Sequence, residues 1–531
     1  MAPNFCRCAS TFSSTRWTNF AIAFFQSAIS WRPGVKGWGG AGGTGPPGAR
    51  GAYWRSRIPP STPSSPDSHA RMPSTVPAER RGMLNALGLH RPELRAWAMY
   101  DWANSGMISV ITTAIFPIYY VTVAGAGVPA AEAGVRYSIA TTVGLSIIAV
   151  LAPILGTLAD YVAIKKRMLA TFMGIGVTAT ALMFLIQRGD LMLASILFIL
   201  ANIGVNGSFV FYESLLPHVA REDELDRVST AAYAMGYIGG GLLLALNLAW
   251  ILKPGLFGLP SGEGLTSAQA TLPTRLAFLS VAVWWVLFSI PLFRRVPEPP
   301  VTRESDERPG QNPVRVAFQR LGETFRALRG YKQAFLMLLA FLIYNDGIGT
   351  IIRMATIFGT ELGIGRGMLI GTIMIVQFVG IPFAFLFGTV AGRIGAKRSI
   401  FIGLAAYVGI SIYGYFITTA TQFLILALFV GMVQGGTQAL SRSLFASMIP
   451  RHRSGEFFGF FGVFEKFAGI FGPLIFGLVL SWAGSSRTAI LAIASFFLIG
   501  GYLLSRVDVE EGQRVARAEE DAVKGGVLVQ G

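Results

Sequence analysis

The sequence predicts an all-α membrane protein whose twelve transmembrane helices form two pseudo-symmetric six-helix bundles, and three observations support this fold class. Of its 531 residues, 52% are hydrophobic and only 14% are charged, whereas a soluble domain carries about 25% charged residues. Twelve apolar runs are each long enough to cross a hydrocarbon core, which takes about 20 residues. The longest connection, 294–331, follows the sixth run and divides the chain into two equal sets.

The two sets of spans define the expected domain boundaries. We expect an N-terminal bundle over 83–293, a cytoplasmic central loop over 294–331, a C-terminal bundle over 332–506 and a cytoplasmic tail over 507–531. The predicted spans, in chain order, are Trp97–Val123, Tyr137–Leu158, Met168–Ile186, Leu191–Leu215, Ser229–Leu252, Arg275–Phe293, Lys332–Thr360, Met368–Ala391, Ser399–Thr419, Gln422–Phe445, Gly455–Trp482 and Thr488–Leu504.

Residues 1–82 differ in composition from the rest of the chain, being rich in Gly, Pro, Ser and Arg and poor in acids. Such a stretch buries too little apolar surface to offset its ordering entropy. Three interpretations stay open: residues upstream of a true start at Met72 or Met83, a disordered tail, or a targeting signal. Both cysteines, Cys6 and Cys8, lie in this stretch, so we expect no disulfide, metal or cofactor in the body.

The positions of Lys and Arg predict the orientation of the spans. These residues concentrate in alternate loops, beginning with the segment before the first span, and cytoplasmic loops carry such an excess. We therefore expect both termini in the cytoplasm of a multi-pass protein in the cell membrane. The net charge of +16 follows from this topology and from the basic first 82 residues, so we expect the lipid bilayer, and no nucleic acid, as a partner.

A repeated loop links the two halves. The segments that begin at Gly156 and Gly388 both read Gly-Thr-x-Ala, followed by a turn and a basic cluster. This spacing resembles the loop signature of the major facilitator superfamily, with Asp160 at its acid and Lys165, Lys166 and Arg167 at its basic end. The resemblance implies the major facilitator fold and a gating role for these four residues.

Seven ionisable side chains fall inside predicted spans, where charge is costly and usually faces a cavity or a partner. The third, sixth, ninth and twelfth spans have none in their interiors, and in the superfamily those helices are peripheral. The charges therefore fall on the spans that would line a solute path. The seven residues are Asp101, Glu213, Asp346, Arg353, Arg442, Glu465 and Lys466.

Two groups on the first and seventh spans are expected to bind substrate or couple protons. Asp346 and Arg353 lie seven residues apart on one helical stripe, and the glycines in Asn345–Gly349 predict a break that exposes backbone to a substrate. Asp101 shares a helical face with Asn104. The alternative for Asp101 and Asn104 is simply a polar helix start.

The remaining intramembrane charges lie on later spans. Glu465 and Lys466 are adjacent in the middle of the eleventh span, and we expect them in the substrate or proton site, with a structural ion pair as the alternative. Glu213 and Arg442 lie near the cytoplasmic ends of their spans. A gating pair and simple snorkelling both fit that depth.

Several longer strings resemble the autophagy-related vacuolar effluxer-like family, a branch of the major facilitator superfamily. The resemblance implies twelve helices and secondary transport, and the fungal vacuolar members are associated with amino-acid efflux. The strings are Tyr100-Asp101-Trp102-Ala103-Asn104-Ser105, Tyr344-Asn345-Asp346-Gly347, Gly436 to Ser443, Gly462 through Lys466 to Gly472-Pro473, Phe211-Tyr212 with Leu216-Pro217-His218, and Val228-Ser229 with Gly236-Tyr237.

The function expected from these features is secondary active transport of a small polar solute, with amino-acid efflux as one candidate. Asp346 or Glu465 would carry the coupling proton, and Arg353 or Lys466 would bind a carboxylate. We expect a monomer that rocks its two halves around a midplane site. A lipid flippase or scramblase on the same fold is the alternative; a membrane-embedded enzyme is a weaker one, since no catalytic motif is found.

Overall fold

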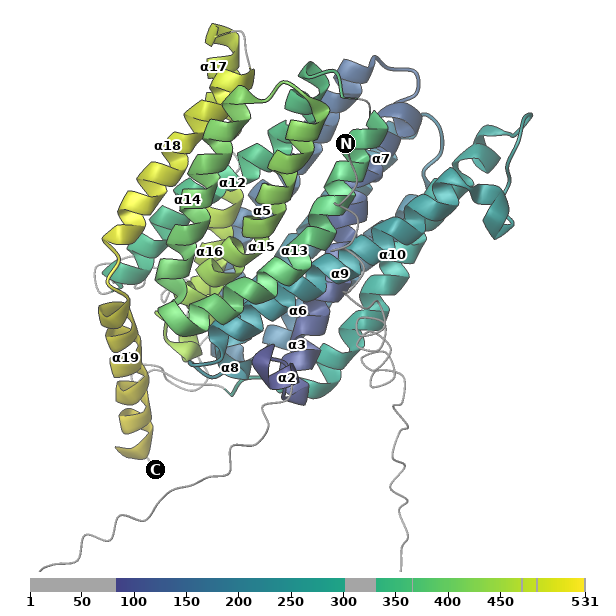
Figure 1. Cartoon of the computed structure of the whole chain (residues 1–531). Coiled ribbons are helices and arrows are strands. Elements are labelled where there is room, and N and C mark those ends of the chain that lie inside the picture. Colours follow the sequence, from purple (N-terminus) through teal and green to yellow (C-terminus); the bar gives the residue numbers. More distant parts are fainter. Residues whose placement is uncertain (1–82, 301–330, 365, 469–470, 484–485, 530–531) are drawn as a thin grey trace, which may run out of the picture. The chain divides into compact units, whose positions relative to one another are not determined.

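The computed structural model describes residues 83–300, 331–364, 366–468, 471–483 and 486–529, and the regular structure of these residues is entirely helical (Figure 1). Within these described ranges, eleven helices are long and apolar enough to cross a membrane. The expectations for 1–82, and for most of the central loop, concern residues outside these ranges. The prediction of an all-helical membrane protein is confirmed.

The N-terminal half contains the first six spans. Its helices are α2 (Met83–Ala86), α3 (Pro92–Gly106), η1 (Met107–Ala114), α4 (Phe116–Tyr119), η2 (Tyr120–Ala124), α5 (Ala130–Val162), α6 (Lys165–Leu182), η3 (Met183–Leu185), α7 (Leu191–Ser214), α8 (Leu216–Val219), α9 (Leu225–Leu252), η4 (Pro254–Phe257) and α10 (Ser267–Arg295). The first span is the continuous run from α3 to η2, in which η1 and η2 are π-helical.

The C-terminal half repeats the arrangement and adds a helix. Its elements are α12 (Lys332–Glu361), α13 (Arg366–Ile394), α14 (Ala396–Phe416), α15 (Ala420–Ala446), η5 (Arg451–Arg453), α16 (Ser454–Phe467), α17 (Phe471–Ala483), α18 (Ser486–Ser505) and α19 (Val509–Val529). Residues 507–531 were expected as a tail, and most of them form α19.

Local sequence explains where several helices begin and end. Pro92 opens α3 at a position where its missing N–H costs no hydrogen bond. Thr266 caps α10 and Thr419 caps α15, each through a reciprocal capping box with the glutamine three residues later. The helix α5 ends where Ala163 adopts a left-handed conformation with φ of 52°, and α6 starts two residues later.

The helix break that the sequence predicts in the seventh span is absent from the described structure, and a break lies in another span instead. The helix α12 runs without interruption through Asn345–Gly349, so that prediction was wrong. The interruption falls instead in the eleventh span, where α16 ends at Phe467 and α17 begins at Phe471. Gly347 is tolerated inside α12 because the neighbouring α18 packs closely there: a Cβ on Gly347 would meet the ring of Phe497 at 2.9 Å and the Cβ of Phe496 at 3.0 Å.

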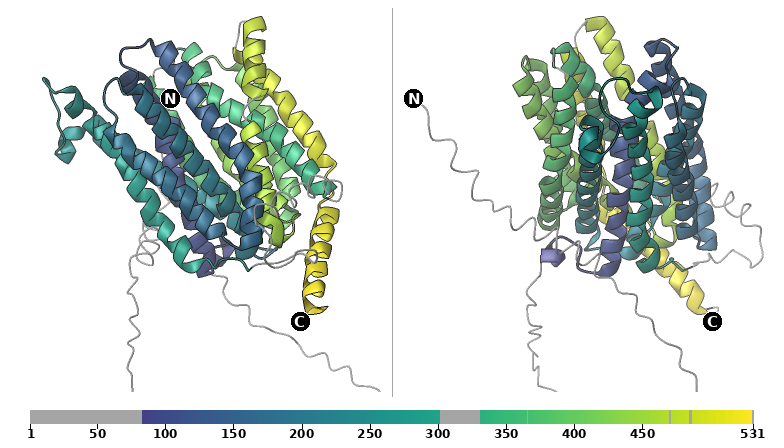
Figure 2. Two further views of the ribbon diagram at one scale, coloured as in Figure 1. Left: turned by 180° about the vertical axis from the view of Figure 1, so that it is seen from behind. Right: turned by 90° about the vertical axis from the view of Figure 1, so that its right-hand side faces the viewer.

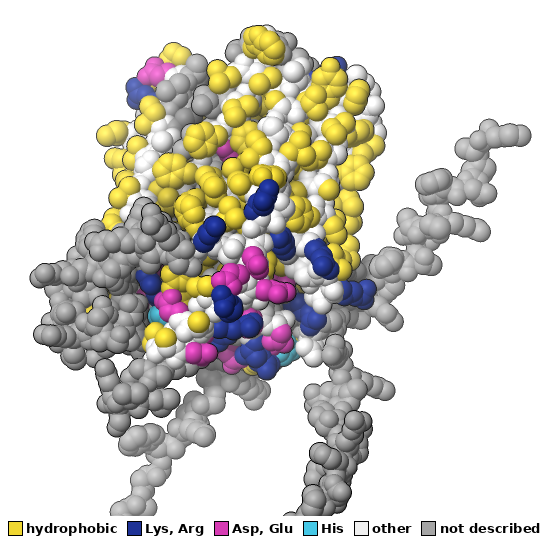
Figure 3. All heavy atoms as spheres, turned by 90° about the vertical axis from the view of Figure 1, so that its left-hand side faces the viewer, with side chains coloured by type: hydrophobic (Ala, Val, Ile, Leu, Met, Phe, Trp, Pro, Cys, Tyr) yellow, Lys and Arg dark blue, Asp and Glu magenta, His cyan; other side chains and the backbone are white. Residues whose placement is uncertain are grey.

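The two halves pack together mainly through two helices of the N-terminal half and three of the C-terminal half. The helix α9 packs on α13 and α15, and α5 packs on α16. Figure 2 shows the long helices side by side from two further directions, with α19 at one end. We call that end, which carries α2, α8 and α19, the base (Figure 1). On the face drawn in Figure 3, hydrophobic side chains cover the upper part, and charged side chains gather toward the base.

Candidate functional site

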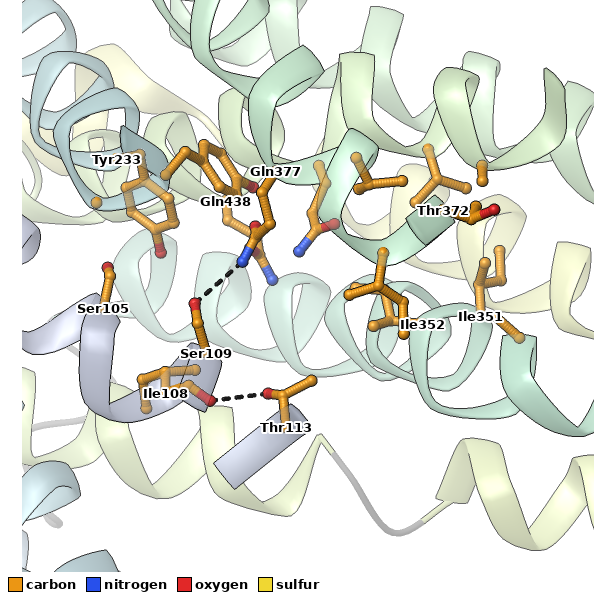
Figure 4. A pocket seen from close by; sticks show the side chains of 18 of the residues that line it. Ser105, Ile108, Ser109, Thr113, Tyr233, Ile351, Ile352, Thr372, Gln377 and Gln438 are labelled. Carbon is orange, nitrogen blue, oxygen red and sulfur yellow. Dashed lines mark hydrogen bonds between the residues drawn. The ribbon is translucent and has the colours of Figure 1, made fainter. Parts of the chain in front are cut away.

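A cavity of about 430 Å³ lies between the two halves. Its walls come from the first span, α7 and α9 on one side and from α12, α13, α15 and α16 on the other. Side chains from both halves point toward one another in this space, including Ser109, Tyr233, Gln377 and Gln438 (Figure 4). The size and the mixed lining suit a small solute.

The π-helical segment η1 brings polar atoms to the cavity wall. Ser105, Ser109 and Thr113 line the cavity at four-residue intervals, and Thr113 bonds back to the carbonyl oxygen of Ile108 at 2.9 Å (Figure 4). Single π-helical turns occur frequently at functional sites. Ser105 belongs to the end of α3, so the first span places two of these three hydroxyl groups, those of Ser109 and Thr113, on the π-helical backbone where the two halves meet.

Two amide side chains connect cavity walls by hydrogen bonds. Gln377 on α13 donates to the hydroxyl of Ser109 at 3.1 Å, which crosses from one half to the other (Figure 4). Gln438 on α15 donates to the side-chain oxygen of Asn345 on α12 at 3.1 Å. Asn345 therefore holds Gln438, which lines the cavity, and is not itself among the described lining residues.

Below the amides, toward the base, Arg442 joins the halves through two carboxylates. Its guanidinium lies 3.4 Å from Asp101 Oδ2 and 3.9 Å from Glu213 Oε1. Asp101 and Glu213 line the cavity, and Arg442 is 1% exposed. The structure thus brings together three residues that the sequence placed on three separate spans.

Arg442 is held in place by further contacts from the N-terminal half. It donates to the hydroxyl of Ser229 at 2.9 Å and to its carbonyl oxygen at 3.0 Å. Its guanidinium carbon lies 4.7 Å from the ring centre of Tyr233 and 5.1 Å from that of Trp97, within range for cation–π attraction. Ser229 and Tyr233 both belong to α9, so this side chain is a strong tie between α15 and α9.

Asp160 forms a second tie between the halves at the base. Its carboxylate lies 2.7 Å from the ammonium of Lys165 and accepts the backbone N–H groups of Gly455 and Glu456 at 3.0 and 2.9 Å. These N–H groups belong to the first turn of α16, where a negative charge is favourable. Lys165 also donates to the hydroxyl of Ser454 at 2.7 Å. Both members of the ion pair are almost fully buried.

The repeated glycines explain why the two halves can approach so closely. A Cβ added to Gly156 would overlap the carbonyl oxygen of Gly455 on α16, and one added to Gly388 would overlap the hydroxyl of Thr230 on α9. In both copies of Gly-Thr-x-Ala, the glycine therefore stands where α5 or α13 crosses a helix of the other half. This close approach gives the repeat a physical reason.

The other two basic residues of the loop have different surroundings. Lys166 donates its ammonium to the carbonyl oxygens of Phe293 and Val296 at 3.0 and 2.7 Å, so it fastens α6 to the end of α10. Arg167 is exposed on the first turn of α6. The structure therefore places Asp160 and Lys165 between the halves, while Lys166 acts within the N-terminal half.

Asp346 and Arg353 flank the interruption of the eleventh span and are not among the described residues that line the cavity. The carboxylate of Asp346, which is 1% exposed, accepts the N–H of Gly472 at the start of α17 at 2.8 Å. Arg353 lies 3.5 Å from the carbonyl oxygen of Ala468, which follows α16. An acidic side chain at the start of a helix and a basic side chain at the end of a helix both complement the helix dipole.

The remaining predicted residues occupy varied positions. Glu465 lies in the last turn of α16 and lines the cavity, whereas the side chain of Lys466 is outside the part of the chain that the structure describes. Asn104 is fully buried in α3. The cavity residues that sequence reasoning missed include Ser109, Tyr233 and Gln377. A search for amides and hydroxyls inside apolar spans would have found them.

The two helical halves with a cavity between them have the fold of the major facilitator superfamily. Solved structures support this: the proton:xylose symporter XylE, bound to 6-bromo-6-deoxy-D-glucose, aligns over 80% of this chain and 98% of its own with a TM-score of 0.60 and 16% identity. The transporter FucP in its outward conformation aligns over 80% and 99% with a TM-score of 0.57 and 13% identity. The general superfamily description also matches residues 20–244.

The family is narrower than the superfamily. The description "Vacuole effluxer Atg22 like" matches residues 135–517. A Bacillus subtilis protein described as uncharacterized MFS-type transporter YxiO is 36% identical over 80% of this chain and 97% of its own length. Autophagy-related protein 22 of Yarrowia lipolytica is 28% identical over 55% of this chain, which spans about half of that fungal protein (51%). The chain belongs to the Atg22-like vacuole effluxer family, as its strings predicted, and is an integral multi-pass membrane protein.

Proposed function

We propose that this protein is a proton-coupled secondary active transporter that moves a small polar solute, by alternating access, across the cell membrane. The observation that carries the proposal is the cavity, which is lined by polar groups of both halves and lies above ties that join the halves at the base. The base faces the cytoplasm, because the loops there carry the excess of Lys and Arg. The protein acts as a monomer, since each chain contains a whole cavity.

In this proposal, the contacts between the halves at the base form the gate of the transport cycle. When Asp160, Lys165 and Arg442 hold their partners, the cytoplasmic side is closed and a solute reaches the cavity from the opposite side. Opening the base breaks these buried contacts and exchanges them for contacts at the other end. Two interfaces that exclude each other in this way give alternating access around a fixed site.

In this proposal, carboxylates at membrane depth bind the proton that is coupled to transport. Protonation of Asp346 would weaken its hold on the N–H of Gly472, which is the contact that positions α17 against α12. Glu465 stands at the other side of the same interruption and faces the cavity. A proton bound here changes the geometry of the eleventh span, which also carries the Asp160 contact at Gly455.

The test is solute-driven proton movement in proteoliposomes that contain the purified full chain and a pH-sensitive dye. Amino acids, amines, sugars and nucleosides are added singly under an imposed pH gradient. We expect one class to move protons, and Asp346→Asn to abolish the coupled flux, whereas Asp223→Asn, an exposed residue at the base, leaves it unchanged. Full pH-driven transport by Asp346→Asn would show that this residue is not the coupler.

A further inference from the structure

A histidine contacts the buried ion pair at the base. His218 lies on α8, the short helix that follows α7, and is partly buried. Its ring nitrogen Nε2 lies 3.1 Å from the ammonium of Lys165. The same ammonium lies 2.7 Å from Asp160 Oδ1 and donates to Ser454 Oγ at 2.7 Å. An ammonium group has three N–H donors and no acceptor, so these three partners match its three hydrogens.

The contact with Lys165 determines the charge of the His218 ring. Because the ammonium can only donate, Nε2 accepts, and the ring is neutral with its hydrogen on Nδ1. A proton added to Nε2 would remove this hydrogen bond and bring two positive charges to 3.1 Å from each other. The closed base therefore favours a neutral His218.

The same ring nitrogen reaches the other half of the protein. The hydroxyl of Ser454, the first residue of α16, lies 3.1 Å from His218 Nε2 and donates to the carbonyl oxygen of Ser214 at 2.9 Å. The helices α6, α7 and α8 belong to the N-terminal half, whereas α16 belongs to the C-terminal half. These contacts of Ser454 therefore form only while the halves meet at the base. When the halves separate there, the ring loses Ser454 and faces water.

The titratable groups around the ring come from several elements. Lys165 on α6, together with Arg451 and His452 on η5, acts on it directly, and Asp160 on α5 is paired with Lys165. On α16 and α19, Glu456 pairs with Arg453, and Glu519 with His452 and Arg453. The other elements that pack on α8 are α3, α7 and α9. Their charged side chains are Glu93, Arg95, Asp101, Glu213, Asp226 and Arg227.

We propose that His218 is a proton-binding site at the base, and that its protonation from the adjacent compartment opens the gate. The inference rests on the gate of the proposed function and adds a site separate from the carboxylates assigned to coupling. In the closed base the Lys165 ammonium occupies Nε2, whereas a histidine in water binds a proton with a pKa of about 6.5. Because the open base binds this proton better, acid shifts the equilibrium toward the open base.

The test measures the opening of the base as a function of pH. Spin labels are placed on Asp223→Cys, before α9, and on Arg398→Cys, on α14, in a full chain whose Cys6 and Cys8 are replaced. Both positions are exposed and lie in different halves, and double electron–electron resonance gives the distance between the labels. If only the open base binds the proton, the ratio of open to closed bases rises about tenfold from pH 8 to pH 5.5. We expect the longer distance to gain population by that factor.

Substitutions of histidines locate the proton. His218→Gln keeps an acceptor oxygen for Lys165 and does not titrate, so we expect the base to stay closed at both pH values. His218→Lys places a permanent positive charge beside Lys165 and should raise the open population at least tenfold at pH 8. The matched control is His90→Gln, because His90 lies 3.1 Å from Glu224 within the N-terminal half. This control and His452→Gln should both keep the full response to pH.

The outcomes separate this inference from the proposed function. A parent chain that ignores pH, a full response in His218→Gln, or loss of the response in either control would overturn the inference. Opening of His218→Gln at both pH values would assign the ring a purely structural role and would also overturn it. If Asp160→Asn opens the base while pH has no effect, the proposed gate stands and the inference alone is refuted. If neither Asp160→Asn nor His218→Lys changes the distance, the gate at the base is refuted as well.

Discussion

Removing the charge of Asp160 should open the base of the protein. Asp160→Asn keeps the size of the side chain but breaks the ion pair with Lys165, in which the two side chains are 1% and 3% exposed. Breaking a buried ion pair by removing one partner costs about 3–5 kcal/mol. The carboxylate also interacts with the α16 N-terminus, which adds about 0.3–1 kcal/mol.

Only part of that cost acts on the equilibrium between closed and open bases. Lys165 keeps its contact with Ser454, and the asparagine oxygen still accepts one backbone N–H. We therefore expect the balance to shift by about 2–3 kcal/mol toward the open base, which is roughly a 30- to 150-fold change in the ratio of the two states.

The assay is labelling of Ser105→Cys, a cavity position, by an impermeant maleimide in a chain whose Cys6 and Cys8 are replaced. From the base side, we expect labelling at least tenfold faster with Asp160→Asn than without it. Asp223→Asn, exposed at the same end, is the control and should not change the rate. Unchanged labelling from the base, or faster labelling from the opposite side, would refute the gating role.

Three further changes have expected outcomes. Gly156→Leu should prevent the contact with Gly455 and lower the melting temperature by several degrees, since overpacking costs about 1–3 kcal/mol; an unchanged melting curve would contradict the close crossing. Although burial raises the pKa of Glu224, hydrogen bonds, first from the Arg221 backbone and side chain, bring it below its ordinary value. The contribution of Glu224 to folding stability is therefore present above the pKa of the unfolded side chain, about 4.3, and is lost as the pH falls through the folded pKa. Glu224→Gln should flatten that part of a stability-versus-pH curve. Arg517→Ala removes an exposed pair between α19 and the loop before α9, so it should change the melting temperature by less than about 2 °C because such pairs contribute about 0–1 kcal/mol; a larger loss would assign α19 a structural role.

Much of the architecture could be predicted because it depends on local sequence. Apolar run length predicts a membrane span wherever it occurs, and the distribution of Lys and Arg predicts orientation. The string around Asp101 and the Gly-Thr-x-Ala repeat indicated the family without any structure. The error over the break in α12 has a clear cause: glycines inside a helix indicate either a break or a close neighbour, and only packing distinguishes the two.

The candidate site could be predicted as a set of residues but not as an arrangement. The chain by itself determined which spans carry charge, since a charge inside an apolar run is visible at any position. It did not determine which charges meet, because Asp101 and Arg442 are 341 residues apart and come together only when α3 packs beside α9 and α9 beside α15. The tertiary structure alone decided that Asp101, Glu213 and Arg442 share one cluster at the cavity, and that Asp346 instead supports an interrupted helix. The physical reason is that a side chain's partner is set by helix packing across the two halves, whereas its cost in the membrane is set by its own chemistry.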